Sequence, residues 1–299
     1  MTSNITNQDS AFHEFLTSQN NPKGIIHISH GMAEHILRYK WLIEQFNNDG
    51  YHVIAMDHRG HGLNIKMNKT RGYFADKEGW NKVVSDLEEL VINTKIRFPD
   101  LDQFLIGHSM GSWIALSAMT RGLIVKGLIL SGSSKVPSTV INIQKLLIYI
   151  LLTLFGKKSV SKLLDFLTIK TYNKSFTPNR TESDWITSDE KSVDNYIEDP
   201  LCGFKVTNLL WSDLANGLTA TFNKNLYAKS KKDTPIFIIS GDKDPVGENG
   251  KGVKRLYEFL VKIFPNSAIS LIEGARHEVF SEKDKDLSYI QIKQFIDSV

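Results

Sequence analysis

The chain has 299 residues, 41% of them hydrophobic and 23% charged, which is typical of a globular protein with a sizeable core. Its formal net charge of +3, without a long run of Lys or Arg, gives no indication of a nucleic-acid partner. Cys202 is the only cysteine, which excludes an intrachain disulfide and favours a reducing compartment. Because residues 1–15 lack the features of a signal peptide, we expect a cytoplasmic protein.

Short apolar runs alternate with amphipathic helical stretches, a pattern that predicts a mostly parallel sheet with helices on both faces. FHEFLTSQ (12–19) is a candidate edge strand. The stronger candidate strands are 24–29, 52–57, 103–108, 125–131, 234–240 and 268–273. Helices are expected near 37–49, 79–98, 110–121, 250–264 and 285–298.

The alternation of strands and helices breaks once, between about residues 135 and 231. An apolar helical run at 140–155 is followed by Gly156, a second helical stretch and polar loops, and the strand pattern returns only at 234. We therefore expect a core formed by residues 1–134 and 232–299, with residues 135–231 inserted as a helical cap.

The sequence GHSMG (107–111) directly follows a candidate strand and precedes a helical stretch. This context is typical of a nucleophile elbow, in which a serine takes a strained backbone conformation between strand and helix. Gly107 and Gly111 provide the clearance that such a turn needs against adjacent backbone. Ser109 is therefore the candidate nucleophile.

A serine hydroxyl needs a histidine to accept its proton and a carboxylate to orient the imidazole. In sheets of this type the order along the chain is Ser, acid, His, and His277 is the only histidine after Ser109. The acid should follow the strand at 234–240, where Asp242 and Asp244 are both available. Asp244 is slightly preferred, because it leaves the chain more length to turn back over the sheet edge.

An oxyanion hole needs two backbone N–H groups aimed at one point. Met110, directly after the candidate nucleophile, provides one of them. The second is expected from HISHGMAEH, the loop after the strand at 24–29, where Gly31 lets the backbone turn and Met32 carries the N–H. A simple turn and helix start is the structural alternative for this loop.

With these residues in place, the chain resembles an α/β-hydrolase of the monoacylglycerol lipase and lysophospholipase-like branch of serine hydrolases. The similarity covers nearly the whole chain, and its motifs are HG-x-x-EH-x-x-RY (30–39), D-H-x-G-H-G (57–62), GHSMG, GDKDPVG, GARHE and the bacterial-type stretch DNYIEDPLCGF. The resemblance implies an eight-stranded sheet with a lid between its sixth and seventh strands. It also implies that Asp244 is the catalytic acid and Met32 the first oxyanion donor. The chain departs from the mammalian members, which commonly have small residues at the positions of Met32 and Ala33, and we expect Met32 to narrow the acyl pocket.

Three other histidines near these motifs are expected to have no catalytic role. His58 and His61 precede the nucleophile and belong to a structured turn, and the side chain of His108 is expected to point to the opposite side of the strand end from Ser109. No Cys/His cluster has the spacing of metal ligands, and GENGKG (247–252) lacks the residues of a phosphate loop. We therefore expect neither a metal nor a cofactor.

The predicted cap is basic and apolar between residues 145 and 174, where six lysines face a single acid, Asp165. Its apolar residues are expected to line an acyl tunnel or to rest on an anionic membrane surface. A cap with its own small core and solvated lysines is the alternative. These apolar residues are Leu146, Leu147, Ile150, Leu151, Leu154, Phe155, Leu163, Leu164, Phe166 and Leu167.

Together, the residues and the resemblance predict a serine carboxylester hydrolase that cleaves a small-molecule lipid ester, a monoacylglycerol or a lysophospholipid, through an acyl-enzyme. An amidase, iminopeptidase-like or thioesterase activity on the same scaffold is one alternative. A catalytically silent binding protein is a second alternative, although such proteins usually lack a member of the triad.

Overall fold

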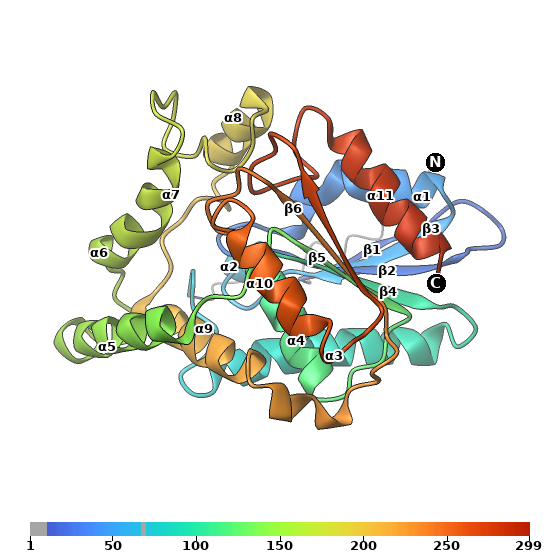
Figure 1. Cartoon of the computed structure of the whole chain (residues 1–299), viewed down its shortest axis with the longest axis horizontal. Coiled ribbons are helices and arrows are strands. Elements are labelled where there is room, and N and C mark those ends of the chain that lie inside the picture. The colour runs from blue at the N-terminus through green and yellow to red at the C-terminus, as the bar shows by residue number, and fades with distance from the viewer. Residues whose placement is uncertain (1–10, 67–69) are drawn as a thin grey trace.

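A central β-sheet organises the molecule (Figure 1). The computed structural model describes residues 11–66 and 70–299. Within this part, seven strands form one sheet in the order β1-β3-β2-β4-β5-β6-β7, and only β1 runs antiparallel to its neighbour. The strands are β1 Phe12–Phe15, β2 Gly24–Ser29, β3 Tyr51–Met56, β4 Gln103–His108, β5 Gly127–Ser131, β6 Ile236–Gly241 and β7 Ser267–Ile272.

The six stronger strand predictions are confirmed with small shifts at their ends, and the candidate edge strand covers only the first half of 12–19. The described residues hold one strand fewer than the resemblance implies. As a result, the long helical segment follows the fifth strand of the chain rather than the sixth.

Helices cover both faces of the sheet, as Figure 1 shows. Successive side chains of a strand point to opposite faces, so Leu105 of β4 packs into one apolar cluster while Phe104 and Ile106 pack into the other. The first cluster includes α3 Gly79–Arg97, α4 Met110–Thr120 and α10 Lys251–Leu260; the second includes α1 Lys40–Asn48 and α11 Lys285–Asp297. The short elements η1 Ile36–Tyr39 and α2 Leu63–Lys66 follow β2 and β3.

Between β5 and β6 the chain adds no strand to the described sheet and is mainly helical. The long helix α5 (Ser138–Phe155) packs on α9 (Asn208–Thr221) and extends away from the sheet in Figure 1. Helix α9 itself packs on α3 and α4 within the main core, so the division at residues 135–231 stays a prediction. The other elements are α6 Lys162–Asp165, η2 Phe166–Lys170, α7 Thr171–Lys174, α8 Glu190–Glu198 and η3 Lys224–Lys229.

The parallel strands β2, β4, β5, β6 and β7 all end at the same edge of the sheet. Ligand sites of open α/β sheets form outside this edge, where the loops after the strands meet. The loops that begin at residues 30, 109, 132, 242 and 273 therefore emerge side by side, although they come from distant parts of the sequence.

Candidate active site

Ser109 lies on a strained turn between β4 and α4. Its backbone has φ 50° and ψ −122°, a conformation that non-glycine residues rarely adopt. A Cβ added to Gly107 would lie 2.6 Å from the Ser112 Cα, and one added to Gly111 would lie 2.0 Å from the Ser29 carbonyl oxygen. The predicted elbow and the need for both glycines are therefore confirmed, and the turn presents Ser109 at the carboxyl edge of the sheet.

His277 and Asp244 form a buried hydrogen-bonded pair. The imidazole Nδ1 lies 3.0 Å from each carboxylate oxygen of Asp244, and the two residues are 3% and 0% exposed. Asp242 instead accepts a hydrogen bond from the Gly274 backbone N–H at 2.8 Å, in the turn after β7. The geometry thus brings Asp244, and not Asp242, to the imidazole.

The electrostatics of this pair favour an ionised carboxylate and a basic imidazole. Burial alone would raise the pKa of Asp244, but the charge and hydrogen bond of His277 outweigh it and hold that pKa below its usual value. Burial alone would lower the pKa of His277, but Asp244 outweighs it, and the pKa of His277 is raised. With Nδ1 directed at Asp244, the other ring nitrogen, Nε2, is the one available as a base.

Ser109 and His277 line one cavity of about 210 Å³. Its walls are largely apolar and come from the elbow, the loop after β2 and the segment between β5 and β6, including Met32, Trp113 and Leu214. Gly132, directly after β5, has φ +56°, and a Cβ there would lie 2.8 Å from the His108 ring and 2.9 Å from the His277 carbonyl oxygen. Gly132 is thus a residue that the site requires, and no motif in the sequence pointed to it.

The loop after β2 packs directly against the elbow. A Cβ on Gly31 would lie 3.3 Å from the Ser109 Cβ, so this loop touches the candidate nucleophile. Met32 and Met110 both line the cavity. Met110 begins α4, and the first N–H groups of a helix have no partner within it. Both residues expected to supply oxyanion donors are therefore beside Ser109.

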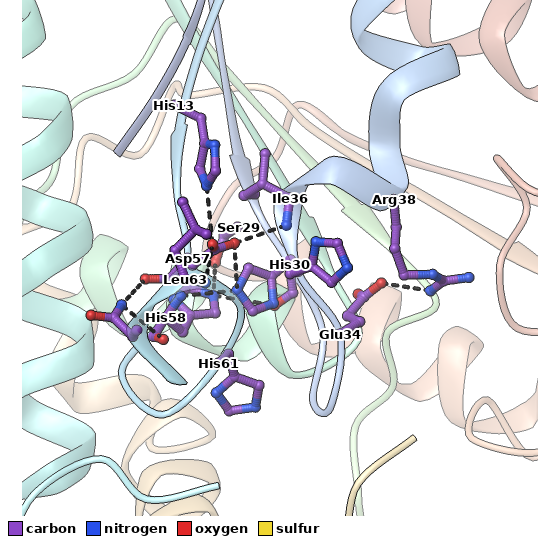
Figure 2. A network of polar contacts seen from close by, with 12 residues as sticks. His13, Ser29, His30, Glu34, Ile36, Arg38, Asp57, His58, His61 and Leu63 are labelled. Atoms are coloured by element: carbon purple, nitrogen blue, oxygen red, sulfur yellow. Dashed lines mark hydrogen bonds and ion pairs between the residues drawn. The ribbon is translucent and has the colours of Figure 1, made fainter. Parts of the chain in front are cut away.

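A buried polar network holds this loop in place (Figure 2). The carboxylate of Asp57, from the D-H-x-G-H-G motif, accepts hydrogen bonds from the Ile36 and Leu63 backbone N–H groups at 3.0 and 2.8 Å and pairs with His13 at 3.0 Å. His30 Nε2 accepts from the His58 backbone N–H at 2.9 Å. The motif at 57–62 thus ties the loop after β3 to the candidate oxyanion loop.

His58 and His61, from the D-H-x-G-H-G motif, are neutral structural groups. Burial lowers the pKa of His58 to about 3 and that of His61 to about 4. Neither residue lines the cavity, and His58 contacts the Ser29 hydroxyl and the His30 carbonyl at 3.1 Å. These contacts agree with the architectural role expected for both.

The predicted orientation of the His108 side chain, on the opposite side of the strand end from Ser109, was wrong. Its ring centroid lies 4.8 Å from that of His277, and it lines the same cavity as Ser109. The strained backbone of Ser109 breaks the alternation of the strand, so that residues 108 and 109 both face the site. Burial, together with His277, lowers the pKa of His108 to about 4, so this ring is a neutral neighbour of the candidate base.

The Glu and Arg of the HG-x-x-EH-x-x-RY motif form a buried ion-pair network beside the site. Glu34 accepts hydrogen bonds from the Gly31 backbone N–H and the Tyr39 hydroxyl. Arg38 donates to Glu34 at 2.7 Å and makes two hydrogen bonds to Glu278, at 2.6 and 2.8 Å. Arg38 therefore joins the candidate oxyanion loop to the residue after His277, a link that spans 240 positions.

The apolar residues expected to form an acyl tunnel do not line the cavity. Most of them are exposed on α5 and on the elements that follow it, including Leu146, Leu154 and Phe155, which are each more than 60% exposed. A minority pack inward: Leu151 and Leu164, with Ile148 and Ala215, form a small separate cluster. The tunnel interpretation of these residues is wrong, because their helices turn them away from Ser109.

One group of metal-ligand type was missed by the sequence reasoning. Side-chain atoms of His35, Asp199 and Cys202 lie within 4.8 Å of one another. His35 Nε2 and Asp199 Oδ2 are 2.8 Å apart, so a hydrogen bond already joins two of the three. Burial raises the pKa of the Cys202 thiol, which opposes formation of the thiolate that binds metals.

Comparisons with known proteins agree with this architecture. The model of the family described as serine aminopeptidase S33 matches residues 20–284. The monoglyceride lipase of Rattus norvegicus is 27% identical over 275 residues, 87% of this chain and 77% of that one. Phospholipase YtpA of Bacillus subtilis is 25% identical over 282 residues, 92% and 96% of the two chains.

The solved structures give the same result. A thermostable carboxyl esterase from Bacillus coagulans, in complex with glycerol, superposes with a TM-score of 0.87 at 26% identity and covers 100% of this chain and 96% of that one. The resemblance to α/β-hydrolases of the monoacylglycerol lipase and lysophospholipase-like branch is therefore confirmed. This chain is a hydrolase with the α/β-hydrolase fold and belongs to the serine aminopeptidase S33 family.

Proposed function

We propose that the protein is a serine carboxylester hydrolase, with Ser109 as the nucleophile, His277 as the general base and Asp244 as the acid that orients it. One observation supports this most directly. Ser109, on its strained turn, lines the same cavity as an imidazole that is hydrogen-bonded to a fully buried carboxylate.

In this mechanism the hydroxyl oxygen of Ser109 attacks the ester carbonyl while Nε2 of His277 takes the hydroxyl proton. The backbone N–H groups of Met32 and Met110 donate hydrogen bonds to the oxyanion of the tetrahedral intermediate. His277 then returns the proton to the departing alcohol, which leaves the acyl group on Ser109. The same imidazole activates a water that hydrolyses the acyl-enzyme.

The proposed substrates are single-chain lipid esters, monoacylglycerols or lysophospholipids. The apolar side chains that surround Ser109 suit an acyl chain. Similar proteins carry the names monoglyceride lipase and phospholipase, and the similar esterase structure holds glycerol. Hydrolysis of a panel of glycerol esters and lysolipids of increasing chain length will rank these substrates.

We further propose that α5 rests on an anionic membrane surface. By length and composition, Ser138–Phe155 is the one helix in the described part of the chain that could cross a membrane, with a mean hydropathy of 1.6 and only 17% of it buried. Ile143, Tyr149 and Leu154 are each nearly 70% exposed. An apolar helix face next to lysines is typical of peripheral binding to anionic lipid. A cytoplasmic location with this membrane association is part of the proposal.

Vesicle flotation tests the membrane contact. Leu154→Glu should reduce binding to anionic vesicles, whereas Ile96→Glu, at an equally exposed apolar position on α3, should not. Equal partitioning into neutral and anionic vesicles would remove the electrostatic part of the proposal.

The catalytic assignment is tested by labelling and by mutation. A fluorophosphonate probe should label the wild-type protein on Ser109, and Ser109→Ala should lose labelling and several orders of magnitude of kcat while unfolding as the wild type does. Ser117→Ala is the matched control, because that hydroxyl contacts Trp80 and Thr221 in the core. Near-wild-type esterase activity of Ser109→Ala would reject the assignment.

Cleavage of an amide is the second candidate, because the family that matches is described as a serine aminopeptidase. The same three side chains could attack an amide or a thioester. Matched pairs of substrates, with one acyl group on an ester, an amide or a thioester, will separate these activities by their kcat/KM values.

A further inference from the structure

Trp185, from the loop before α8, packs its indole against the imidazole of His277. The ring centroids are 4.9 Å apart, with an angle of 34° between the planes. Tyr172 lies on the indole as well, at 5.3 Å. Trp185 is 7% exposed and lines the cavity together with Ser109. The candidate base therefore has an aromatic wall that comes from the segment between β5 and β6.

Backbone hydrogen bonds fix this segment against the loop that carries His277. The backbone N–H of Glu278 donates to the Ile186 carbonyl at 2.8 Å. The Thr187 hydroxyl donates to the Ser281 carbonyl at 3.0 Å. These contacts come directly after Trp185 in one segment and after His277 in the other, so they hold the two rings beside each other.

Arg276 and Glu282 add charged contacts to the same junction. The guanidinium of Arg276 donates to the carbonyl oxygens of Asp184 and Thr187. The carboxylate of Glu282 accepts from the Arg276 backbone N–H at 2.7 Å and from the backbone N–H and hydroxyl of Ser188. The residues on both sides of His277 are thus tied to the segment 184–188, and the indole beside the imidazole is part of a fixed wall.

The identity of this side chain needs a chemical explanation. The indole Nε1 of Trp185 is buried, and no described residue accepts a hydrogen bond from it. A buried N–H without a partner lowers stability, and phenylalanine would fill most of the same space without one. The indole does one thing better than the phenyl ring, because its π face attracts a cation most strongly. The cation that forms here in the proposed mechanism is the imidazolium of His277.

The other groups that face His277 come from four elements. Asp244 binds Nδ1 from the loop after β6, and Glu278 is the next residue along the chain. Glu34 acts from the loop after β2, and His108 is a neutral ring at the end of β4. The carboxylates act on the ring through the Nδ1 hydrogen bond and through their charge, whereas Trp185 lies beside it with the ring planes tilted by 34° and the centroids 4.9 Å apart. This separation is within the range of about 6 Å over which an indole attracts a cation.

We propose that Trp185 is a positioning residue for the hydrolase, and that its indole holds the imidazole of His277 and stabilises the imidazolium formed in each transition state. This inference rests on the proposed function, because it assigns Trp185 to the base of that mechanism. Trp185 donates no proton and forms no bond in the reaction.

The test is the pH dependence of kcat/KM for a soluble p-nitrophenyl ester, in the wild type and in Trp185→Phe and Trp185→Leu. Both replacements keep the ring face dry, but they weaken or remove the cation–π attraction. The acid limb, which reports protonation of the free base, should move to lower pH in the order Trp, Phe, Leu, by about half a unit or more for Leu. The plateau rate of Trp185→Leu should fall about tenfold.

Trp80→Phe is the matched control. Trp80 is 6% exposed, but its Nε1 donates to the Ser117 hydroxyl at 3.0 Å, and neither residue lines the cavity. Its replacement should lower the urea midpoint and leave the acid limb in place. Trp185→Phe should move the acid limb to lower pH. It should also raise the urea midpoint, because it removes an unpaired buried N–H.

A second readout does not depend on turnover. Protonated imidazole quenches the fluorescence of an indole that it touches, so the difference between wild-type and Trp185→Phe fluorescence should titrate with the midpoint of the kinetic acid limb. An acid limb of Trp185→Leu at the wild-type pH would overturn the role of Trp185. If that variant does not fold, a fluorescence difference that does not titrate with the acid limb would overturn it.

Failure of the inference and failure of the proposed function give different results. If the fluorophosphonate probe labels Ser109 and the acid limb of Trp185→Leu matches that of the wild type, only the role of Trp185 is wrong. If Ser109→Ala retains activity, the proposed function fails and takes the role of Trp185 with it.

Discussion

Replacing Asp244 by Asn alters only one terminal group, and the structure predicts which way the new amide faces. Oδ1 of Asp244 accepts a hydrogen bond from the Val246 backbone N–H at 2.8 Å, and Oδ2 accepts from the Ser240 hydroxyl at 3.2 Å. Both oxygens are 3.0 Å from Nδ1 of His277. In an asparagine the amide oxygen has to accept the hydrogen bond from the Val246 N–H. The NH₂ group therefore replaces Oδ2 and donates toward Nδ1.

The imidazole must then carry its own proton on Nε2, the atom that is meant to accept the proton of Ser109. In trypsin-type proteases, the same change of tautomer lowers kcat by about 10⁴-fold, which corresponds to about 5 kcal/mol of transition-state stabilisation. We expect a loss of this size for Asp244→Asn in steady-state hydrolysis of a p-nitrophenyl ester, with little change in KM because the apolar cavity is unaltered.

Asp242→Asn is the control for this prediction. Its carboxylate binds the Gly274 N–H and the neighbouring Lys243 at a partly exposed turn, away from His277, so we expect activity close to that of the wild type. A value of kcat for Asp244→Asn within about tenfold of the wild type, or a larger loss in Asp242→Asn, would refute the tautomer argument.

Gly111→Ala should abolish activity and lower the free energy of unfolding by at least about 3 kcal/mol, because its Cβ would lie 2.0 Å from a backbone oxygen of β2. In urea unfolding, Gly156→Ala is the comparison, because a Cβ there would meet open space and the cost is only the backbone strain at φ 82° and ψ 172°, about 1–3 kcal/mol. Arg38→Met leaves two buried carboxylates without their cation and should lower the free energy of unfolding by about 3–5 kcal/mol. The guanidinium of Arg59 is 41% exposed, so Arg59→Met should lower it by less than about 1 kcal/mol. Equal losses in the two variants would contradict the buried network. Stability should also fall with acid. Burial lowers the pKa of His58 to about 3. Between pH 6.5 and pH 3 this histidine is therefore protonated in the unfolded chain but neutral in the folded one. The stability present above pH 6.5 is lost as the pH falls toward 3. His58 alone should lower the free energy of unfolding by about 2 kcal/mol at pH 5 relative to pH 7, as the difference between wild type and His58→Gln will show, and no difference would mean that His58 is not held neutral.

The parts of the site that the sequence predicts well are those fixed by local chain geometry. Ser109 needs only a strand, two small neighbours and a helix, and all of these lie within a few residues of it. The choice of His277 followed from the order of elements in this type of sheet, because every other histidine comes before the nucleophile. The six parallel strands were predictable because buried parallel strands read as short apolar runs, whereas the resemblance implied one strand more than the described residues hold.

Contacts between distant segments could not be read from the sequence. Spacing alone barely separated Asp244 from Asp242, because both lie in one turn and only the path of the chain near Val246 decides which reaches His277. Gly132 and Trp185 carry no local motif, and both matter through their contact with His277, which lies 145 and 92 positions further along the chain. His108 was misplaced because alternation along a strand ends at a strained residue.

The junction between residues 184–188 and the loop of His277 sets a limit on how lids can be exchanged within this architecture. A chimaera that swaps only the outward-facing helix α5, Ser138–Phe155, leaves Trp185 and its neighbour Tyr172 in place beside the candidate base and can acquire a new selectivity. A chimaera that replaces the whole connection from β5 to β6 also removes the carbonyl and hydroxyl partners of Arg276 and Glu282. In that design the replacement lid has to supply new contacts that hold His277, or hydrolysis is lost together with the original specificity.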